Sequence, residues 1–201
     1  MGAVFSLPTL PKQHVIKRSF WHPQALPAVV PLTRISQGSD SPFFNFDPQD
    51  FPNADIRRVS EGWYVFLRLD GFEHRILLSG PRSSSSTYAA VLALDAFFEL
   101  RAHATRRLWR ALSGRPPGPD YRKLPLQRRA RLIQSMRALD ARQDGASYRA
   151  IAEVLFGAER VPKRAWNTHD LRNRTIRLVQ SGVALMRGEY INLLSYPLRR
   201  R

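Results

Sequence analysis

The chain has 201 residues, 43% of them hydrophobic and 10% aromatic, so it is long enough and apolar enough to fold into one domain or two small ones. Its formal net charge of +16 exceeds what solubility requires and indicates a polyanionic partner, usually a nucleic acid and less often an acidic membrane surface. Because the chain has no cysteine, disulfides and cysteine-ligated zinc or iron–sulfur centres are excluded.

The positive charge is concentrated toward the C-terminus. Residues 121–201 hold 18 lysines and arginines against 6 acidic residues, a net charge of +12, whereas residues 1–120 carry +4. Pro8 and Pro11 interrupt the apolar residues near the N-terminus, so no signal peptide is predicted. No apolar run approaches the roughly 20 residues of a membrane span. We therefore expect no membrane association and a location in a bacterial cytoplasm, on the nucleoid.

Residues 1–114 are predicted to form an α+β region. Residues 1–60 contain eight of the fifteen prolines, so this segment is expected to be extended or irregular, with short edge strands such as "AVVPLT". A β-hairpin is predicted over residues 63–78. Its strands are "WYVFLRL" and "FEHRILL", and Asp70 and Gly71 between them suit a type I′ turn.

A long helix is predicted next, over residues 87–112. The segment "GPRSSSS" before it is expected to be a loop that ends at an N-cap, Ser86 or Thr87, and Gly114 with the following prolines should end the helix. Its first half is apolar almost all round, so we expect it to be buried against the hairpin. The side chains predicted to lie in this core are Phe97, Phe98, Leu108 and Trp109.

Residues 115–125 are predicted to be a linker, residues 126–194 a helical domain and residues 195–201 a basic tail. The first helix is expected over 126–143, with Leu132, Ile133, Met136 and Leu139 on one face. The second is expected over 147–156, with Ser147 as N-cap and Gly157 as the C-terminal cap. The composition of "GASYRAIAEVLFG" is that of the first helix of a helix-turn-helix pair, whose second helix enters the major groove of DNA.

The third helix is predicted from Asn167 or Thr168 to Arg187. Successive residues lie about 100° apart, and this rotation gathers an apolar face of Leu171, Leu178, Val179, Gly182, Val183 and Met186. The opposite face gathers Asp170, Asn173, Arg174, Arg177, Gln180 and Ser181, with Arg172 at its margin. Arginine suits guanine and asparagine suits adenine. The candidates for base contact are therefore Asn173, Arg174, Arg177 and Asp170.

A second set of basic residues is expected to hold DNA phosphates. The candidates for phosphate contact are Lys163, Arg164, Arg172, Arg149, Arg128, Arg129, Arg199 and Arg200. Arg131 is expected to serve solvation or phosphate contact. The connection at 158–166, about nine residues, is longer than the usual three or four. It is either an extended turn or a helix that begins early at Trp166, and we favour an extended turn with Trp166 buried.

The sequence carries no pattern typical of an enzyme. The five histidines show no metal-ligand spacing, and no phosphate-binding glycine loop or activated nucleophile is recognisable. We therefore predict no cofactor, no metal and no catalytic residue. RNA remains a less favoured alternative, because no RNA-binding signature is present.

The segment from Leu124 to Leu194 resembles the RovC-like DNA-binding domain family, also known as domain of unknown function 2285. The resemblance is carried by "GASYRAIAEVLFG", "HDLR", "RTIRLV" and "LMRGEY", and extends more loosely upstream. It implies a transcription regulator with an extended-turn helix-turn-helix that binds double-stranded DNA. It also implies an activator of excision and transfer of integrative and conjugative elements, or of type VI secretion genes. RNA polymerase is a further candidate partner, which the sequence leaves open.

The resemblance leaves two points open. Many relatives carry a small Trp-rich N-terminal activator domain whose motif this chain does not show, so that domain is encoded separately, joined by frameshifting or not required. Some relatives are antiactivators that bind this domain rather than DNA. The net charge of +12 over residues 121–201 favours the DNA-binding branch.

Overall fold

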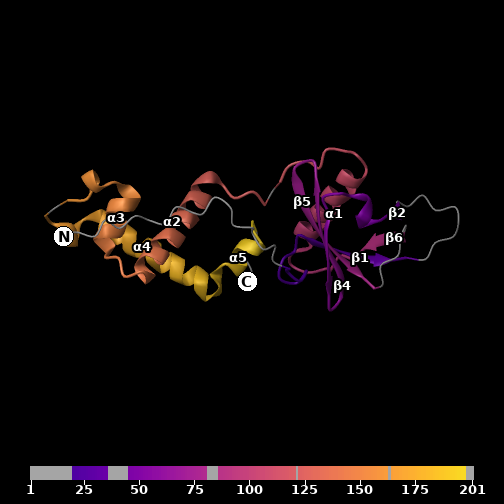
Figure 1. Ribbon diagram of the computed structural model, residues 1–201, viewed down its shortest axis with the longest axis horizontal. Helices are drawn as coiled ribbons and strands as arrows, with labels where there is room; N and C mark the ends of the chain where they lie inside the picture. The colour runs from indigo at the N-terminus through magenta and orange to yellow at the C-terminus, as the bar shows by residue number, and fades with distance from the viewer. Residues whose placement is uncertain (1–19, 36–44, 81–85, 121, 163, 198–201) are drawn as a thin grey trace. The chain divides into compact units, whose positions relative to one another are not determined.

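The structure, a computed structural model, describes residues 20–35, 45–80, 86–120, 122–162 and 164–197. The chain divides into two compact units (Figure 1). Among the described residues, the sheet unit takes in 20–120 and 194–197, and the helical unit takes in 122–193. Each unit is described below by itself.

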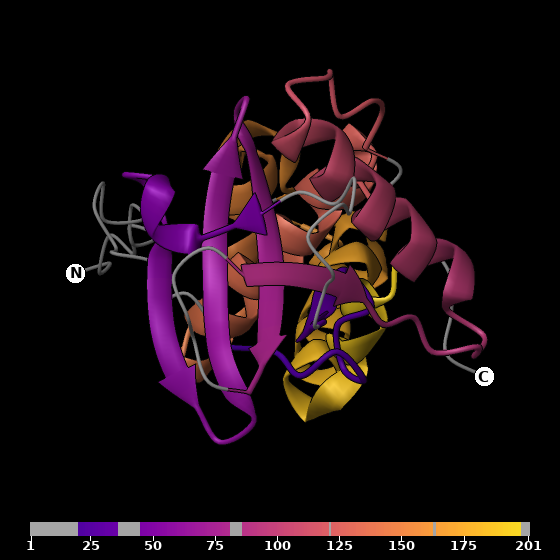
Figure 2. The same ribbon diagram turned by 90° about the vertical axis from the view of Figure 1, so that its right-hand side faces the viewer.

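The sheet unit contains, within the described residues, a six-stranded sheet in the order β2-β6-β1-β5-β4-β3. Its strands are β1 (Val29–Arg34), β2 (Asn45–Phe46), β3 (Asp55–Val59), β4 (Gly62–Leu69), β5 (Phe72–Ser79) and β6 (Ser86–Ala90). Strands β3, β4 and β5 lie side by side and antiparallel (Figure 2). The sheet is mixed, because β1 pairs with β5 in parallel. The unit is thus α+β, as the sequence predicted.

The predicted hairpin is confirmed. Leu69 pairs with Phe72, so two residues connect β4 to β5. Asp70 has φ of 49° and Gly71 has φ of 78°, the positive values that a type I′ turn requires.

The prediction of an edge strand at "AVVPLT" is wrong, because β1 lies inside the sheet between β5 and β6. Pro31 is tolerated there because the pairing with β6 covers only Leu32–Arg34. The Pro31 carbonyl accepts a hydrogen bond of 3.0 Å from the Val91 amide, which follows β6. Pro31 has no amide hydrogen to donate in return, and the pairing of β1 with β6 does not extend past Leu32 on this side.

The predicted helix over 87–112 is correct only in its second half. Residues 86–90 form β6, which pairs with both β1 and β2, and helix α1 runs from Phe98 to Leu112. Just before the helix, the Asp95 side chain accepts a hydrogen bond of 2.9 Å from the Phe97 amide. The predicted N-cap at Ser86 or Thr87 is therefore wrong, and the expected loop at 81–85 lies outside the described residues.

The start of α1 is fixed by Arg101, which is 4% exposed. Its guanidinium donates two hydrogen bonds to the Asp95 carboxylate, at 3.2 and 2.8 Å, and a third of 2.9 Å to the Pro23 carbonyl. The same contact holds the pKa of Asp95 below its ordinary value. One buried cation thus joins the helix to the segment that precedes β1.

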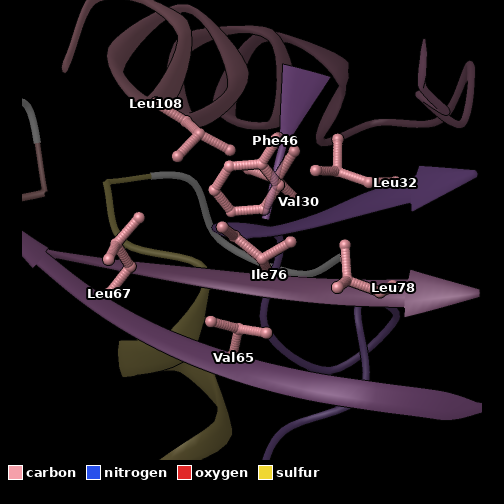
Figure 3. Packing of buried hydrophobic residues seen from close by; sticks show 8 residues of the cluster. All are labelled: Val30, Leu32, Phe46, Val65, Leu67, Ile76, Leu78 and Leu108. Carbon is pink, nitrogen blue, oxygen red and sulfur yellow. The ribbon is translucent and has the colours of Figure 1, made fainter. Parts of the chain in front are cut away.

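Both faces of the sheet are buried. On one face, side chains of β1, β2, β4 and β5 meet Leu108 of α1 (Figure 3). On the other face a second cluster contains Tyr64, Phe66 and Leu77, and Leu26 with Leu194 cover it. The chain after the helical unit therefore packs into the sheet unit again at Leu194.

One polar residue lies on the α1 side of the sheet without a hydrogen-bond partner for its Nε2 atom among the described residues. This residue is His74, which is 7% exposed. Burial lowers the pKa of His74 to about 4, and the nearby Arg107 guanidinium also lowers it. Arg107 is itself held by an ion pair of 2.9 Å with Asp120. His74 is therefore neutral in the folded protein.

Three of the four predicted core residues of α1 are less buried than expected. Leu108 is buried, at 3% exposure, whereas Phe97 and Phe98 are half-buried. Trp109 is 45% exposed, and the Arg115 guanidinium lies 5.1 Å from its ring centroid. The prediction that Trp109 lies in the core is therefore wrong, because the helix turns only one face to the sheet.

The helical unit contains α2 (Leu126–Gln143), α3 (Tyr148–Phe156), α4 (Asp170–Ala184) and α5 (Ile191–Leu194), the last of which ends at the first residue of the sheet unit (Figure 1). A π-helical turn at Leu185–Glu189 follows α4. The bounds predicted for α2 are confirmed. Small residues dominate the core of this unit, which is formed by Ala138, Ala141, Ala146, Ile151, Leu178 and Val179.

The predicted inner face of α2 is partly wrong. Ile133 and Met136 are 39% and 43% exposed, whereas Leu139 is buried as predicted. The buried positions of α2 include Ser135 and Ala138, which the sequence analysis did not select. Small side chains occupy this face because α4 approaches it closely.

Candidate nucleic-acid interface

Helix α3 begins and ends as its sequence predicts. The Ser147 hydroxyl accepts a hydrogen bond of 3.2 Å from the Ala150 amide, which caps the N-terminus. At the other end Gly157 has φ of 97°, and its amide donates to the Glu153 carbonyl at 3.0 Å. Ile151 and Ala152 face the core and are almost fully buried. These three features confirm the predicted helix.

The connection from α3 to α4 covers residues 157–169 and is longer than the predicted nine residues. It contains two single 3-10 turns, at Ala158–Arg160 and Trp166–Thr168. Helix α4 starts at Asp170, later than predicted, because the His169 side chain accepts a hydrogen bond of 3.2 Å from the Leu171 amide and caps the helix. Trp166 is half-buried, so the expectation that it is buried is wrong.

Helices α2 and α4 touch at Gly182. A Cβ atom at Gly182 would lie 2.7 Å from the Ser135 carbonyl oxygen and 2.8 Å from Leu139 Cβ. Thr175, also on α4, is fully buried and turns its hydroxyl to the Leu171 carbonyl at 2.7 Å. The crossing therefore depends on the absence of a side chain at residue 182, and it fixes how α4 is held against the rest of the unit.

The polar face predicted for α4 is exposed. Five of the six predicted residues are exposed, namely Asp170, Asn173, Arg174, Arg177 and Gln180, whereas Ser181 is half-buried. Arg172 is also half-buried, which agrees with its predicted place at the margin. The buried positions opposite are Thr175, Leu178, Val179 and Gly182. Met186, predicted to lie on the apolar face, is 60% exposed because the regular helix has ended at Ala184.

Two arginines of this face have intramolecular contacts. The Arg174 guanidinium lies 4.7 Å from the centroid of the Phe156 ring, at the C-terminal end of α3. Arg177 lies 3.9 Å from the Asp170 carboxylate, and the two side chains are 65% and 83% exposed. An ion pair this exposed contributes little. Arg174 is therefore positioned by an aromatic neighbour, whereas Arg177 remains open to an outside anion.

The arginines of α4 share a hollow with α2. Residues of both helices line it: Gln127, Ala130, Arg131 and Gln134 from α2, and Arg174, Arg177 and Leu178 from α4. None of these lining residues is acidic. The two glutamines and Phe156 were not selected from the sequence, although residues 127, 131 and 134 share one helical face.

The predicted phosphate contacts have different surroundings. Arg164, Arg128 and Arg129 are exposed. Arg149 pairs with Glu153 at 3.0 Å along α3, so it already has an acidic partner. Lys163, Arg199 and Arg200 lie outside the described residues.

The helical unit as a whole is basic. Residues 122–193 hold 15 lysines and arginines against 6 acidic residues, a net charge of +9. No helix among the described residues is long and apolar enough to cross a membrane. A basic helical unit with an exposed arginine face has the properties of the nucleic-acid-binding class of proteins.

Comparison with known proteins identifies the family. Residues 91–195, just over half of the chain, match the RovC DNA-binding domain family, described as the DNA-binding domain of a type VI secretion system (T6SS) transcription factor. The chain belongs to this family and therefore carries a transcription-factor DNA-binding domain. No curated protein matches. No solved structure matches either.

The matched segment covers more than the helical unit. It begins directly after β6, includes α1 and ends at Ser195, so the family domain takes in parts of both compact units. Ser195 is fully buried in the sheet unit.

Proposed function

We propose that the protein is a sequence-specific DNA-binding activator of transcription, with α3 and α4 acting as an extended-turn helix-turn-helix. The observation that carries this proposal is the exposed polar face of α4, which presents Asn173, Arg174 and Arg177 from a helix packed firmly on α2. Family membership supports DNA as the partner. The description of the family supports secretion genes as targets, with the transfer genes of a mobile element as the second possibility.

In this proposal α4 enters a major groove with its N-terminal half. Asp170, Asn173, Arg174 and Arg177 remain the candidates for base contact, and Arg174 stands first among them. Its stacking on Phe156 limits the conformations of a long side chain before DNA binds. A preorganised guanidinium loses less entropy when it forms a bidentate contact with guanine.

Substitution of Arg174 tests this function. Arg174→Ala should cost about 1–3 kcal/mol of binding to a selected site and relax specificity at one base pair. Arg174→Lys should keep the salt dependence of DNA binding but lose the discrimination between base pairs at that position, because lysine cannot form the bidentate contact with guanine. The measurement is a genomic-fragment selection followed by fluorescence anisotropy with the selected duplexes.

Arg187→Ala is the charge-matched control, because Arg187 is exposed beyond the end of α4. It should leave the ranking of sequences unchanged. If the wild-type protein selects no sequence, or if Arg174→Ala and Arg187→Ala give the same ranking, the assigned face is wrong.

A further inference from the structure

The hollow between α2 and α4 has the geometry of a site for an anion. On α2 its wall is a single stripe, because residues 127, 130, 131 and 134 follow the i, i+3, i+4, i+7 pattern of one helical face. On α4 residues 174, 177 and 178 follow the same pattern. The two stripes therefore face the same space from opposite sides, although 40 or more residues separate them in the sequence.

The lining of the hollow is strongly positive. It contains Arg131, Arg174 and Arg177 and no carboxylate, and its buried member is Leu178, at 4% exposure. The Asp170 carboxylate lies 3.9 Å from Arg177, and its side chain is 83% exposed. Arg131 has no acidic partner among the described residues. Arg131, Arg174 and Arg177 all line this one hollow, so their like charges repel each other, and an anion in the hollow would relieve that repulsion.

The helix packing keeps this space open. The close contact of α2 with α4 at Gly182 lies on the C-terminal side of the hollow on both helices. Ala130, the smallest of the lining residues, leaves room between the arginines. The Gln127 and Gln134 amides add neutral donors on the α2 wall. The hollow is thus part of the packed unit and does not depend on a loop.

We infer that this hollow holds one backbone phosphate of the bound DNA, contacted from the α2 wall by Arg131 and from the α4 wall by Arg177. The inference rests on the proposed function and refines it, because it moves Arg177 from base contact to phosphate contact and adds α2 to the DNA-binding surface. A base edge needs only one guanidinium, in a bidentate contact, whereas this hollow is lined by Arg131 and Arg177 from two different helices. A phosphate supplies the matching negative charge and the several acceptors.

The salt dependence of binding to a random-sequence duplex tests the site. Each phosphate neutralised contributes about 0.9 to the slope of log K against log salt concentration. Arg131→Gln and Arg177→Gln should each lower the slope by part of this amount. The double variant should lower it by about 0.9 in total, because both side chains hold the same phosphate. A total near 1.8 would mean two separate phosphates and would overturn the shared site.

Arg137→Gln is the matched control, because Arg137 is exposed on α2 and does not line the hollow. An equal loss of slope in this control would mean that only overall charge matters, which would also overturn the inference. Arg131→Lys should keep the wild-type slope, since it keeps the charge. Circular dichroism of each variant confirms that the exposed substitutions leave the fold intact.

Two further outcomes distinguish a failure of this inference from a failure of the proposed function. If the wild-type protein binds no duplex at any salt concentration, the proposed function fails and the inference fails with it. If the wild-type protein binds DNA and the double variant keeps its slope, only the inference fails. A final experiment compares the thermal melting of the protein in inorganic phosphate and in chloride at equal ionic strength. Suppose that phosphate stabilises the protein only when Arg131 is present, while the Arg131 and Arg177 variants leave the salt dependence of DNA binding unchanged. That result would assign the hollow to a free anion and overturn the DNA contact.

Discussion

Replacing Gly182 by alanine tests the packing that holds α4 in place. The added Cβ would lie 2.7 Å from the Ser135 carbonyl oxygen, about 0.7 Å inside the 3.4 Å of ordinary contact. Because the obstacle is backbone, α2 and α4 must move apart. Overpacking of this kind costs about 1–3 kcal/mol. The gain in helix propensity from glycine to alanine offsets about 1 kcal/mol of it. We therefore expect a net loss of about 1 kcal/mol in the free energy of unfolding.

Urea unfolding of the full-length protein measures this change. The midpoint urea concentrations of the variants are compared, provided that the slope of the free energy of unfolding against urea concentration is the same. Gln180→Ala and Gln180→Gly are the controls. Gln180 is exposed on the same helix, so the difference between these variants reports the propensity alone. If Gly182→Ala were more stable than the wild-type protein by that difference, the two helices would not be in close contact and the reasoning would be refuted.

Two further predictions concern the sheet unit. Arg101→Leu should lower the free energy of unfolding by about 2–3 kcal/mol, because the hydrogen bonds to Asp95 and Pro23 are lost together. Arg106 is exposed on the same helix, so Arg106→Leu should change the free energy of unfolding little. Equal effects of the two substitutions in urea unfolding would contradict the anchoring role of Arg101. His74 has its pKa lowered from 6.5 to about 4, so the unfolded chain takes up a proton that the folded protein does not bind. The contribution of neutral His74 to the free energy of unfolding is therefore fully present above about pH 6.5, and up to about 3 kcal/mol of it is lost as the pH falls toward 4. His74→Leu should make the free energy of unfolding less dependent on pH over this range, as measured by urea titrations at several pH values.

Local signals in the sequence predicted the elements whose ends are determined by their own residues. The Asp70-Gly71 turn, the Ser147 cap and the Gly157 cap each act within four residues, so the hairpin and α3 could be predicted closely. Helix α2 has local end signals of the same kind, because Pro125 precedes it and Gly145 follows two residues after its last residue.

The wrong predictions concern features that depend on distant parts of the chain. Residues 86–90 have no local reason to leave a helix, and they form β6 because β1 and β2 supply hydrogen bonds on both sides. The central place of β1, in spite of Pro31, depends on where β6 ends. Rotation of a single helix could not show that Ser135 and Ala138 face α4, because that choice follows from the contact at Gly182.

The same distinction applies to the candidate interface. The exposed face of α4 follows from its own periodicity, and its five exposed residues were predicted. The hollow was not, because Arg131 and Arg177 meet only when α2 and α4 are packed together. The stacking of Arg174 on Phe156 likewise joins two helices through a connection whose length was underestimated.

The central claim is that the protein binds DNA with sequence specificity. Its most direct test measures the affinity of the wild-type protein for two duplexes of equal length at physiological salt, one selected from the genome and one scrambled, and takes the ratio of the two affinities. A sequence-specific regulator should show a ratio of at least about 10³. The ratio should fall in Arg174→Ala and stay unchanged in Arg187→Ala. Equal affinity for the two duplexes, or no binding to either, would contradict the account.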